Sequence, residues 1–310
     1  MNPPDRHDVE AAARVIAGHI HETPVLVSRT LDALAGCDVF FKSEVQQKVG
    51  AFKARGACHA VMSASSALIT HGVATHSSGN HGAALAWAAR LRQVPAYVVV
   101  PNNASIFKRA AIERYGASII DCGPSLADRE SALDALVATT GAHVIPPYDD
   151  ARIIAGQGTA ALEMERQVPG LESLWVPVGG GGLAAGCIAA LSTSAIRVIG
   201  AEPELASDAA ASMRLGCRQP QMPPLTIADG LRTSLGHLNF DMFQTYGITI
   251  CLVSEAEIKE AQRELMSMLK VLVEPSSAVP WAALRRYGPG GARRVGIVLT
   301  GGNIDVSAQL

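Results

Sequence analysis

The chain has 310 residues, of which 48% are hydrophobic and 17% charged, so it can bury a substantial core in one large domain or two interleaved lobes. Lys and Arg number 26 against 28 Asp and Glu, and the formal charge of −2 points to neither nucleic acid nor an anionic membrane as a partner. No stretch approaches the roughly 18 uninterrupted apolar residues of a membrane span, and the N-terminus has no apolar signal core, so we expect a cytoplasmic protein.

Short β-rich runs alternate with helical patterns along the chain. Apolar side chains at helical spacing predict a first helix over Val9, Ala12, Ala13, Ile16 and Ile20. Seven β-rich runs follow, at residues 39–41, 72–77, 96–100, 174–178, 197–201, 248–253 and 295–300. Ser254 and Glu257 then form a capping box that predicts a helix beginning there. This alternation predicts an α/β protein with mostly parallel strands covered by helices.

Two further features concern structure rather than chemistry. Residues 216–224 are rich in Pro and Gln and predict an exposed loop. The six cysteines stand singly, without the close pairs of a zinc site or a redox motif. We therefore expect buried free thiols at Cys37, Cys58, Cys122, Cys187, Cys217 and Cys251.

The strongest local signal is a run of four glycines between a strand and a helix. Gly179, Gly180, Gly181 and Gly182 follow the strand predicted at 174–178 and precede an apolar helical stretch. Successive backbone N–H groups in such a turn face one anion, and the helix dipole adds favourable potential, so we predict a phosphate site. The pattern is neither G-x-G-x-x-G nor a P-loop, which favours a ligand smaller than a dinucleotide. The alternative is a tight turn without a ligand.

Lys53 lies within KVGAFKARGA at 48–57, among small and apolar residues. Desolvation in such surroundings lowers the pKa of an amine and favours the neutral, nucleophilic form that Schiff-base chemistry needs. For this segment alone, a solvated surface lysine is the more common alternative.

The segment THSSGNHGAALAWAAR at 75–90 also joins a strand to a helix through glycine. It places Ser77, Ser78, Asn80 and His81 at the carboxyl end of a strand, where open α/β sheets bind ligands. The alternative is that the Ser and Asn side chains only cap the helix that comes next.

Taken together, these segments resemble the serine/threonine dehydratase and serine racemase family, which belongs to the fold type II pyridoxal-phosphate enzymes. Eight blocks match in order and span nearly the whole chain: HETPVL at 21–26, FFKSEVQQKVGAFKARGA at 40–57, THSSGNHG at 75–82, IAGQGTAALE at 154–163, VPVGGGGL at 176–183, TIADGL at 226–231, EPSSA at 274–278 and LTGGNID at 299–305. The resemblance implies an α/β fold with two open, twisted, mostly parallel sheets and helices on both faces. It also implies a large cofactor-binding domain from residues 1–65 and 150–310, a small mobile domain from residues 66–149 that closes over the substrate, and a homodimer.

The resemblance implies where the cofactor binds. Lys53 carries pyridoxal 5′-phosphate as a Schiff base, and the loop from Gly179 to Gly182 holds its phosphate. Asn80 bonds to the ring hydroxyl, and Thr300 lies beside the pyridine nitrogen. Because a neutral hydroxyl holds a proton on that nitrogen less firmly than an Asp does, the ring suits elimination of a β-leaving group. The remaining predicted cofactor contacts are Phe52, Leu183 and Glu274.

The implied reaction removes water and ammonia from a small β-hydroxy amino acid, with Lys53 as the base that takes the α-proton. The predicted substrate contacts are Ser77, Ser78, Gly79, Asn80, His81, Arg129 and Thr233. Ser78 also matches the residue that the racemases of this family use on the face opposite the lysine, so racemisation is the alternative activity. Arg129 matches an arginine near the racemase active site and could bind a second substrate carboxylate bidentately. Its alternative is an arginine on a solvated helix face.

A divalent cation is a further implication of the resemblance. Glu202, Ala206 and Asp208 match the metal triad of the family, which consists of two carboxylates and a backbone carbonyl. Such all-oxygen ligation predicts Mg²⁺ or Ca²⁺. Without the resemblance, two ordinary solvated carboxylates would be the simpler interpretation.

The chain departs from the family pattern around the lysine. Many relatives have Thr-Gly-Ser-Phe-Lys where this chain has Val49, Gly50, Ala51, Phe52 and Lys53, so two hydroxyls are missing and the pocket is less polar. The variant resembles hydroxyaspartate ammonia-lyases, and L-serine, L-threonine, 3-hydroxyaspartate and phenylserine all stand as candidate substrates. The sequence ends a few residues after LTGGNID, so we expect no C-terminal regulatory domain of the kind found in biosynthetic threonine dehydratases, and a catabolic, unregulated or metal-modulated enzyme. A pseudoenzyme that only carries the cofactor and a β-replacement enzyme are further alternatives.

Overall fold

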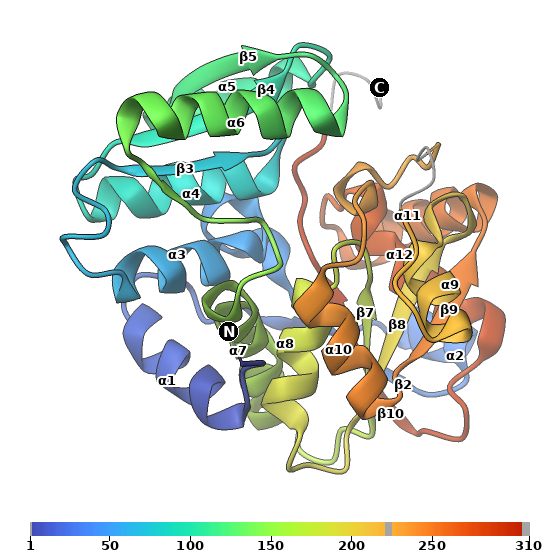
Figure 1. The fold of residues 1–310 in the computed structure, drawn as a ribbon. Helices are drawn as coiled ribbons and strands as arrows, with labels where there is room; N and C mark the ends of the chain where they lie inside the picture. The colour runs from blue at the N-terminus through green and yellow to red at the C-terminus, as the bar shows by residue number, and fades with distance from the viewer. Residues whose placement is uncertain (1, 221–224, 306–310) are drawn as a thin grey trace.

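The computed structural model describes residues 2–220 and 225–305, and Figure 1 shows two sheets in two units. The larger sheet has six strands in the order β1-β2-β10-β7-β8-β9. Their bounds are β1 (Val25–Leu26), β2 (Asp38–Ser43), β7 (Ser173–Pro177), β8 (Arg197–Pro203), β9 (Thr249–Val253) and β10 (Arg294–Leu299). Only β1 pairs antiparallel, so the carboxyl ends of the other five strands meet at one edge of the sheet.

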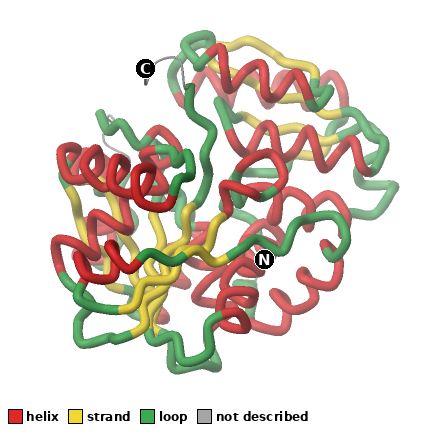
Figure 2. Tube along the Cα trace, turned by 180° about the vertical axis from the view of Figure 1, so that it is seen from behind, coloured by secondary structure: helices red, strands yellow, loops and turns green. Residues whose placement is uncertain are grey.

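Helices cover both faces of the larger sheet (Figure 2). One face packs against α1 (Arg6–Ile16), α7 (Ala151–Gln167), α8 (Gly182–Leu191), α9 (Asp208–Leu215) and α10 (His237–Tyr246). The other face packs against α2 (Arg29–Ala35), α11 (Glu255–Leu269) and α12 (Pro275–Tyr287). Strands with helices on both faces are buried on both sides, which explains why β7 and β10 read as nearly continuous apolar runs.

The smaller sheet has four parallel strands in the order β5-β4-β3-β6. They are β3 (Val73–His76), β4 (Ala96–Pro101), β5 (Ser118–Cys122) and β6 (His143–Val144), covered by α4 (Asn80–Leu91), α5 (Ile106–Arg114) and α6 (Leu126–Thr140). Val98 and Val99 show how both faces are filled, because successive strand residues point to opposite sides. Val98 packs with α4 and α5, and Val99 packs with α6.

The helix α3 (Lys53–Ser63) connects the larger sheet to the smaller one and crosses α7 through glycines. A Cβ on Gly156 of α7 would lie 2.6 Å from the Cα of Gly56 in α3, and a Cβ on Gly186 of α8 would lie 2.6 Å from the amide nitrogen of Gly158 in α7. Only glycine permits such close helix contacts. Short 3₁₀ turns complete the chain: η1 (Glu44–Gln46), η2 (Lys48–Gly50), η3 (Glu204–Ala206) and η4 (Asp229–Leu231).

The structure confirms the α/β fold class and the seven predicted strands, and the Ser254–Glu257 capping box opens α11. The predicted first helix is too long, because α1 ends at Ile16 and Gly18 adopts a positive φ before Ile20 is reached. The short strands β1, β5 and β6 were not predicted.

The predictions for the thiols and for one loop are met in part. All six cysteines are free, but only Cys58, Cys187 and Cys251 are buried; Cys217 is exposed. Residues 216–218 lie in an exposed turn, and residues 221–224 of the predicted loop fall outside the described residues. No helix in the described part of the chain is long and apolar enough to cross a membrane.

Candidate active site

Lys53 opens α3 at the carboxyl edge of the larger sheet. The preceding residue, Phe52, donates its N–H to the carbonyl of Thr300 at 2.9 Å, which fixes α3 beside the end of β10. The Lys53 amine donates to the carbonyl of Pro147 at 2.7 Å and lies 5.1 Å from the centre of the Phe52 ring. Desolvation lowers the pKa of Lys53 to about 8, although the negative charge of Glu274 opposes this shift. A much larger fraction of this amine is therefore neutral near pH 7 than of an exposed lysine.

The four-glycine loop lies at the same edge, between β7 and α8. All four glycines are buried, and Gly181 has a φ of +88°. A Cβ on Gly180 would overlap the ring of Tyr148, and a Cβ on Gly182 would lie 2.9 Å from the Tyr148 carbonyl oxygen. The carbonyl of Pro147 binds the Lys53 amine, and the ring of the next residue, Tyr148, covers the glycine loop. The lysine and the glycine loop therefore lie on either side of this two-residue segment.

The glycine loop fits an anion. The backbone amides of residues 179–183 have no acceptor among the described residues, although this loop is buried. Buried amides without acceptors are rare in folded proteins, and amides at the N-terminus of a helix favour a phosphate. The desolvated amine and this amide cradle together fit the aldehyde and the phosphate of pyridoxal phosphate.

A second loop, residues 77–79, connects β3 to α4. The Ser77 hydroxyl accepts hydrogen bonds from the amides of Gly79 at 3.3 Å and Gly82 at 3.1 Å, so its role is structural at least in part. Ser78 is exposed and makes no hydrogen bond with the described residues. His81 is buried, and its Nε2 lies 3.1 Å from the carbonyl of Ile145. Burial, and next the charge of Lys53, lowers the pKa of His81 to about 3, so this imidazole is neutral.

Asn80 is held by partners from the larger unit. Its Nδ2 donates to both carboxylate oxygens of Glu274, at 2.9 and 3.1 Å, and its Oδ1 accepts from Asn303 at 2.9 Å. Glu274 is buried, and burial raises its pKa, while the charges of Lys108 and Lys53 oppose the shift. Asn80 is therefore oriented, which suits its predicted role beside the cofactor ring.

Two predicted hydroxyl groups lie at this edge with partners that the sequence did not reveal. The Thr300 hydroxyl lies 3.0 Å from the Ser277 hydroxyl, and both are buried. Thr233 donates to the Tyr148 hydroxyl at 2.8 Å. Leu183 packs in the core behind the glycine loop. Tyr148 was not predicted, because the Pro-Pro-Tyr-Asp-Asp segment indicates a turn and nothing in it marks a contact with glycines about 30 residues later.

A buried ionic cluster supports the helix that carries Lys53. Arg55 of α3 pairs with Glu44 and Glu163 at 2.7 Å each, and Lys42 pairs with Glu163 at 2.6 Å. The Arg55, Glu44 and Lys42 side chains are fully buried. Because each charge has an opposite partner, the cluster fixes α3 against β2 and α7 without leaving an uncompensated charge.

The structure does not bring Arg129 into contact with the other predicted residues. It lies on α6, where its Nη2 donates to the carbonyl of Pro124 at 2.9 Å and its Nε is buried without a partner among the described residues. Burial lowers the pKa of His76, at the end of β3, and the charge of Arg129 lowers it further. Arg129 therefore lies near His76 and has no contact with Lys53 among the described residues.

The predicted metal triad lies elsewhere, from the carboxyl end of β8 through η3 to the start of α9. Glu202, Ala206 and Asp208 are all buried. The Glu202 carboxylate accepts the amides of Ala209 at 3.1 Å and Ala210 at 2.9 Å, and Asp208 accepts the amide of Leu235 at 2.8 Å. Neither carboxylate has an ion-pair partner among the described residues, and within that part of the chain no cluster of three His, Cys, Asp or Glu side chains is suited to a metal. Two buried carboxylates with a backbone carbonyl nonetheless fit a hard divalent cation.

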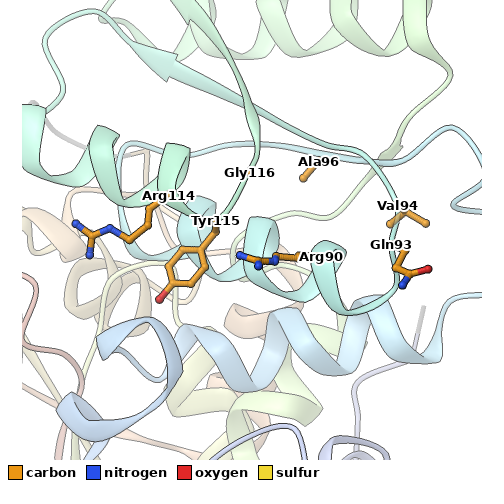
Figure 3. Close-up of a pocket in the computed structure, with 7 residues that line it drawn as sticks. All are labelled: Arg90, Gln93, Val94, Ala96, Arg114, Tyr115 and Gly116. Carbon is orange, nitrogen blue, oxygen red and sulfur yellow. The ribbon is translucent and has the colours of Figure 1, made fainter.

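A cavity of about 350 Å³ lies in the smaller unit, apart from the carboxyl edge of the larger sheet (Figure 3). Arg90, Arg114 and Tyr115 line it, at the C-terminal ends of α4 and α5. The partial negative charge at a helix C-terminus explains cations there without any ligand. None of the predicted site residues lines this cavity.

Comparisons with known proteins agree with this geometry. Residues 16–301 match the family model described as pyridoxal-phosphate dependent enzyme. The chain is 43% identical to beta-hydroxyaspartate dehydratase of Paracoccus denitrificans, over 99% of this chain and 98% of that protein. It is also 43% identical to serine racemase of Dictyostelium discoideum, over 97% and 95% of the two chains. The crystal structure of T.th. threonine deaminase superposes with a TM-score of 0.93 at 40% identity, covering 97% of this chain and 99% of that one.

Three findings agree: a desolvated lysine, a glycine loop with unpaired amides, and close relatives along almost the entire chain. The two mostly parallel sheets are those of fold type II. The chain belongs to the family of pyridoxal-phosphate-dependent enzymes, within the group that contains the serine/threonine dehydratases and the serine racemases.

Proposed function

We propose that this enzyme is a dehydratase that converts a small β-hydroxy amino acid to a 2-oxo acid, water being eliminated and ammonia released. The observation that carries the proposal is the 43% identity to a beta-hydroxyaspartate dehydratase over 99% of the chain. The Lys53 amine and the glycine loop supply the groups that such a reaction needs.

When bound, pyridoxal phosphate supplies the electron sink that makes the α-proton of an amino acid acidic. The glycine loop would hold its phosphate, and Phe52, Asn80, Leu183, Glu274 and Thr300 are the other proposed contacts. The neutral Lys53 amine takes the α-proton, because its lowered pKa keeps an unshared electron pair available near neutral pH. The β-carbon then loses its hydroxyl, which leaves with a proton as water. A water molecule afterwards hydrolyses the released aminoacrylate, which gives the 2-oxo acid and ammonia.

The substrate is proposed to bind between the two units. Its α-carboxylate fits the loop of residues 77–81, where the amides of Ser78, Asn80 and His81 have no acceptor among the described residues. His81 and Thr233 are the other proposed substrate contacts, since the charge of Lys53 acts on His81 and Thr233 binds Tyr148 beside the glycine loop. The less polar lysine segment, with Ala51 in place of a hydroxyl, favours 3-hydroxyaspartate or phenylserine over L-serine and L-threonine. Arg129 stays a prediction for a second carboxylate.

Racemisation is the second candidate activity. Two serine racemases are 43% identical to this chain, and Ser78 presents an exposed hydroxyl on the loop where the substrate is proposed to bind. A proton donor on the face opposite Lys53 would return a proton to the α-carbon from the other side. The two activities share the removal of the α-proton and differ in the next step, which is loss of the β-hydroxyl in one and reprotonation in the other.

Several expectations of the resemblance belong to the same proposal. They are a Mg²⁺ or Ca²⁺ ion at Glu202, Ala206 and Asp208, a homodimer, a cytoplasmic location, and a division into residues 1–65 with 150–310 and residues 66–149. The buried pair of carboxylates supports the metal. Burial, with the nearby charge of Asp208, raises the pKa of Glu202, and a bound cation would stabilise both carboxylates in their charged form.

Product analysis tests the proposal. Purified enzyme is incubated with L- and D-serine, L-threonine, both 3-hydroxyaspartate diastereomers and phenylserine, and ammonia, 2-oxo acid and the opposite enantiomer are quantified. A dehydratase releases ammonia and 2-oxo acid in equal amounts from at least one substrate. Enantiomer formation without ammonia would replace the dehydratase by the racemase, and inactivity of the cofactor-loaded protein on every substrate would contradict both.

A further inference from the structure

Lys108 lies where the two units meet. It belongs to the first turn of α5 in the smaller unit, and its ammonium forms an ion pair with Asp229 of η4 in the larger unit. Only 13% of the Lys108 side chain is exposed, against 38% of the Asp229 side chain. A lysine so enclosed is held in one place, unlike the solvated lysines of a protein surface.

The Lys108 side chain lies over the loop that precedes α4. A Cβ on Gly79 would lie 3.1 Å from Lys108 Cδ and 3.8 Å from its Nζ. The amides of Ser78 in this loop and of Asn80 and His81 in the first turn of α4 have no acceptor among the described residues. A substrate whose α-carboxylate is bound by these amides would therefore have the ammonium of Lys108 as a neighbour.

The charge of Lys108 also reaches the interior of the site. Burial raises the pKa of Glu274, and the next-largest influence is the charge of Lys108, which lowers it. The charge of Lys53 lowers the pKa of the same carboxylate, so both lysines lie near Glu274. Glu274 in turn binds Asn80 of the proposed site. An ammonium has three N–H donors, and Lys108 uses one of them on Asp229, which leaves two for a ligand.

Arg129, the cation expected from the sequence to bind a second carboxylate, is less well placed. Its guanidinium is engaged with the carbonyl of Pro124, and its charge acts on His76 and Cys122. No contact joins it to the 77–79 loop or to Glu274 within the described residues. Lys108 has such a contact, through Gly79.

We propose that Lys108 binds the second carboxylate of a dicarboxylic substrate and so makes 3-hydroxy dicarboxylic amino acids the preferred substrate class. This inference rests on the proposed dehydratase function. The loop amides take the α-carboxylate, and the β-carboxylate shares the Lys108 ammonium with Asp229. Lys108 is then a specificity-determining residue, because a monocarboxylic substrate makes no use of it.

Steady-state kinetics of the holoenzyme with 3-hydroxyaspartate and L-threonine test this role. Lys108→Met should raise KM for 3-hydroxyaspartate at least about tenfold, the loss expected for one charge-assisted hydrogen bond, and change KM for threonine less than about twofold. Lys108→Arg should recover most of the affinity. Arg109→Met is the matched control, since Arg109 is the next residue of α5 and pairs with exposed Asp121; it should leave both KM values unchanged.

Competitive inhibition by succinate and by butyrate gives a second readout that needs no turnover of a dicarboxylic substrate. Lys108→Met should weaken succinate selectively. Equal losses for both substrates and both inhibitors, or a selective loss in Arg129→Met that Lys108→Met lacks, would overturn the proposal. If the wild-type enzyme turns over no β-hydroxy amino acid, the proposed function fails, and binding of succinate against butyrate still decides the role of Lys108.

Discussion

At the scale of single residues, the surroundings of Lys53 determine the pKa of its amine. Its amine is desolvated and bound to one neutral carbonyl, and the only opposing influence on its pKa is the charge of Glu274. The pKa therefore falls from 10.5 to about 8. Each unit of such a shift reflects about 1.4 kcal/mol of preference for the neutral amine.

This shift predicts how the apoenzyme recaptures its cofactor. Schiff-base formation needs the neutral amine, so the rate should rise with pH to a midpoint of about 8 and level off above it, instead of rising towards 10.5. Stopped-flow absorbance of apoenzyme mixed with pyridoxal phosphate measures this profile. A rate that still rises steeply between about pH 9 and 10 would show that Lys53 is not desolvated.

Some site residues could be predicted from the sequence because their chemistry is local. The four glycines and Lys53 stand in segments whose composition indicates phosphate binding and a desolvated amine. The place of Tyr148 and the proposed role of Lys108 could not be predicted in this way. Each depends on a contact with a residue far along the chain, which is Gly180 for Tyr148 and Asp229 for Lys108. Ser77 was expected to bind substrate, yet its hydroxyl also accepts two amides of its own loop.

At the scale of elements, glycines set the distance between the helices behind the site. The helix α3 that carries Lys53 packs on α7 where Gly56 meets Gly156, and a Cβ on Gly156 would lie 2.6 Å from the Gly56 Cα. The backbone must move to accept even one methyl group.

Gly156→Ala should therefore destabilise the protein by about 1–3 kcal/mol, the usual cost of overpacking, although alanine favours helices. Denaturant unfolding measures the change. Ala138→Val on the exposed face of α6 is a control that also adds atoms to a helix, and it should change stability by less than about 0.5 kcal/mol. An unchanged or increased stability of Gly156→Ala would show that α3 and α7 can separate without cost.

The turn between β8 and α9 carries the proposed metal site. Mg²⁺ at about 100 times its dissociation constant should stabilise the protein by about 2.7 kcal/mol, visible as a higher Tm. Glu202→Gln should abolish this increase, because a ligand charge is lost. Glu204→Gln is the matched control, since Glu204 is exposed and pairs with Arg286. A Tm that does not respond to Mg²⁺, Ca²⁺ or a chelator would contradict the site.

The strands were predictable where they are buried on both faces, and less so where they are short. The two-residue strands β1 and β6 hold too few residues to show a period, and β5 lies at the edge of its sheet with a partly exposed pattern. The end of α1 depends on Gly18, whose positive φ breaks a helical pattern that continues to Ile20.

At the scale of the whole molecule, the proposed site lies between two units. In this proposal the larger unit supplies Lys53 and the glycine loop, and the smaller unit supplies the 77–79 loop and Lys108. Their polar contacts across the site include Asn80 with Glu274, Asn80 with Asn303, and Lys108 with Asp229, and these rely on side chains rather than on a shared sheet. Such contacts can break and form as the smaller unit moves.

We therefore expect the smaller unit to close over a bound dicarboxylate. Small-angle X-ray scattering of the holoenzyme should show a smaller radius of gyration with saturating succinate than without it. Lys108→Met should reduce this change, whereas Arg109→Met should not. An identical radius in both states of the wild-type enzyme would indicate that the units do not move relative to one another.

Lys53 is central to the proposed pyridoxal-phosphate dehydratase. The most direct test of its role is the rate of ammonia release from 3-hydroxyaspartate by the wild-type enzyme and by Lys53→Ala, both supplied with the cofactor. We predict equal amounts of ammonia and 2-oxo acid from the wild type, and a rate at least about a hundredfold lower in the variant, as expected for loss of a general base. Ammonia release that persists in Lys53→Ala would contradict this role for the lysine.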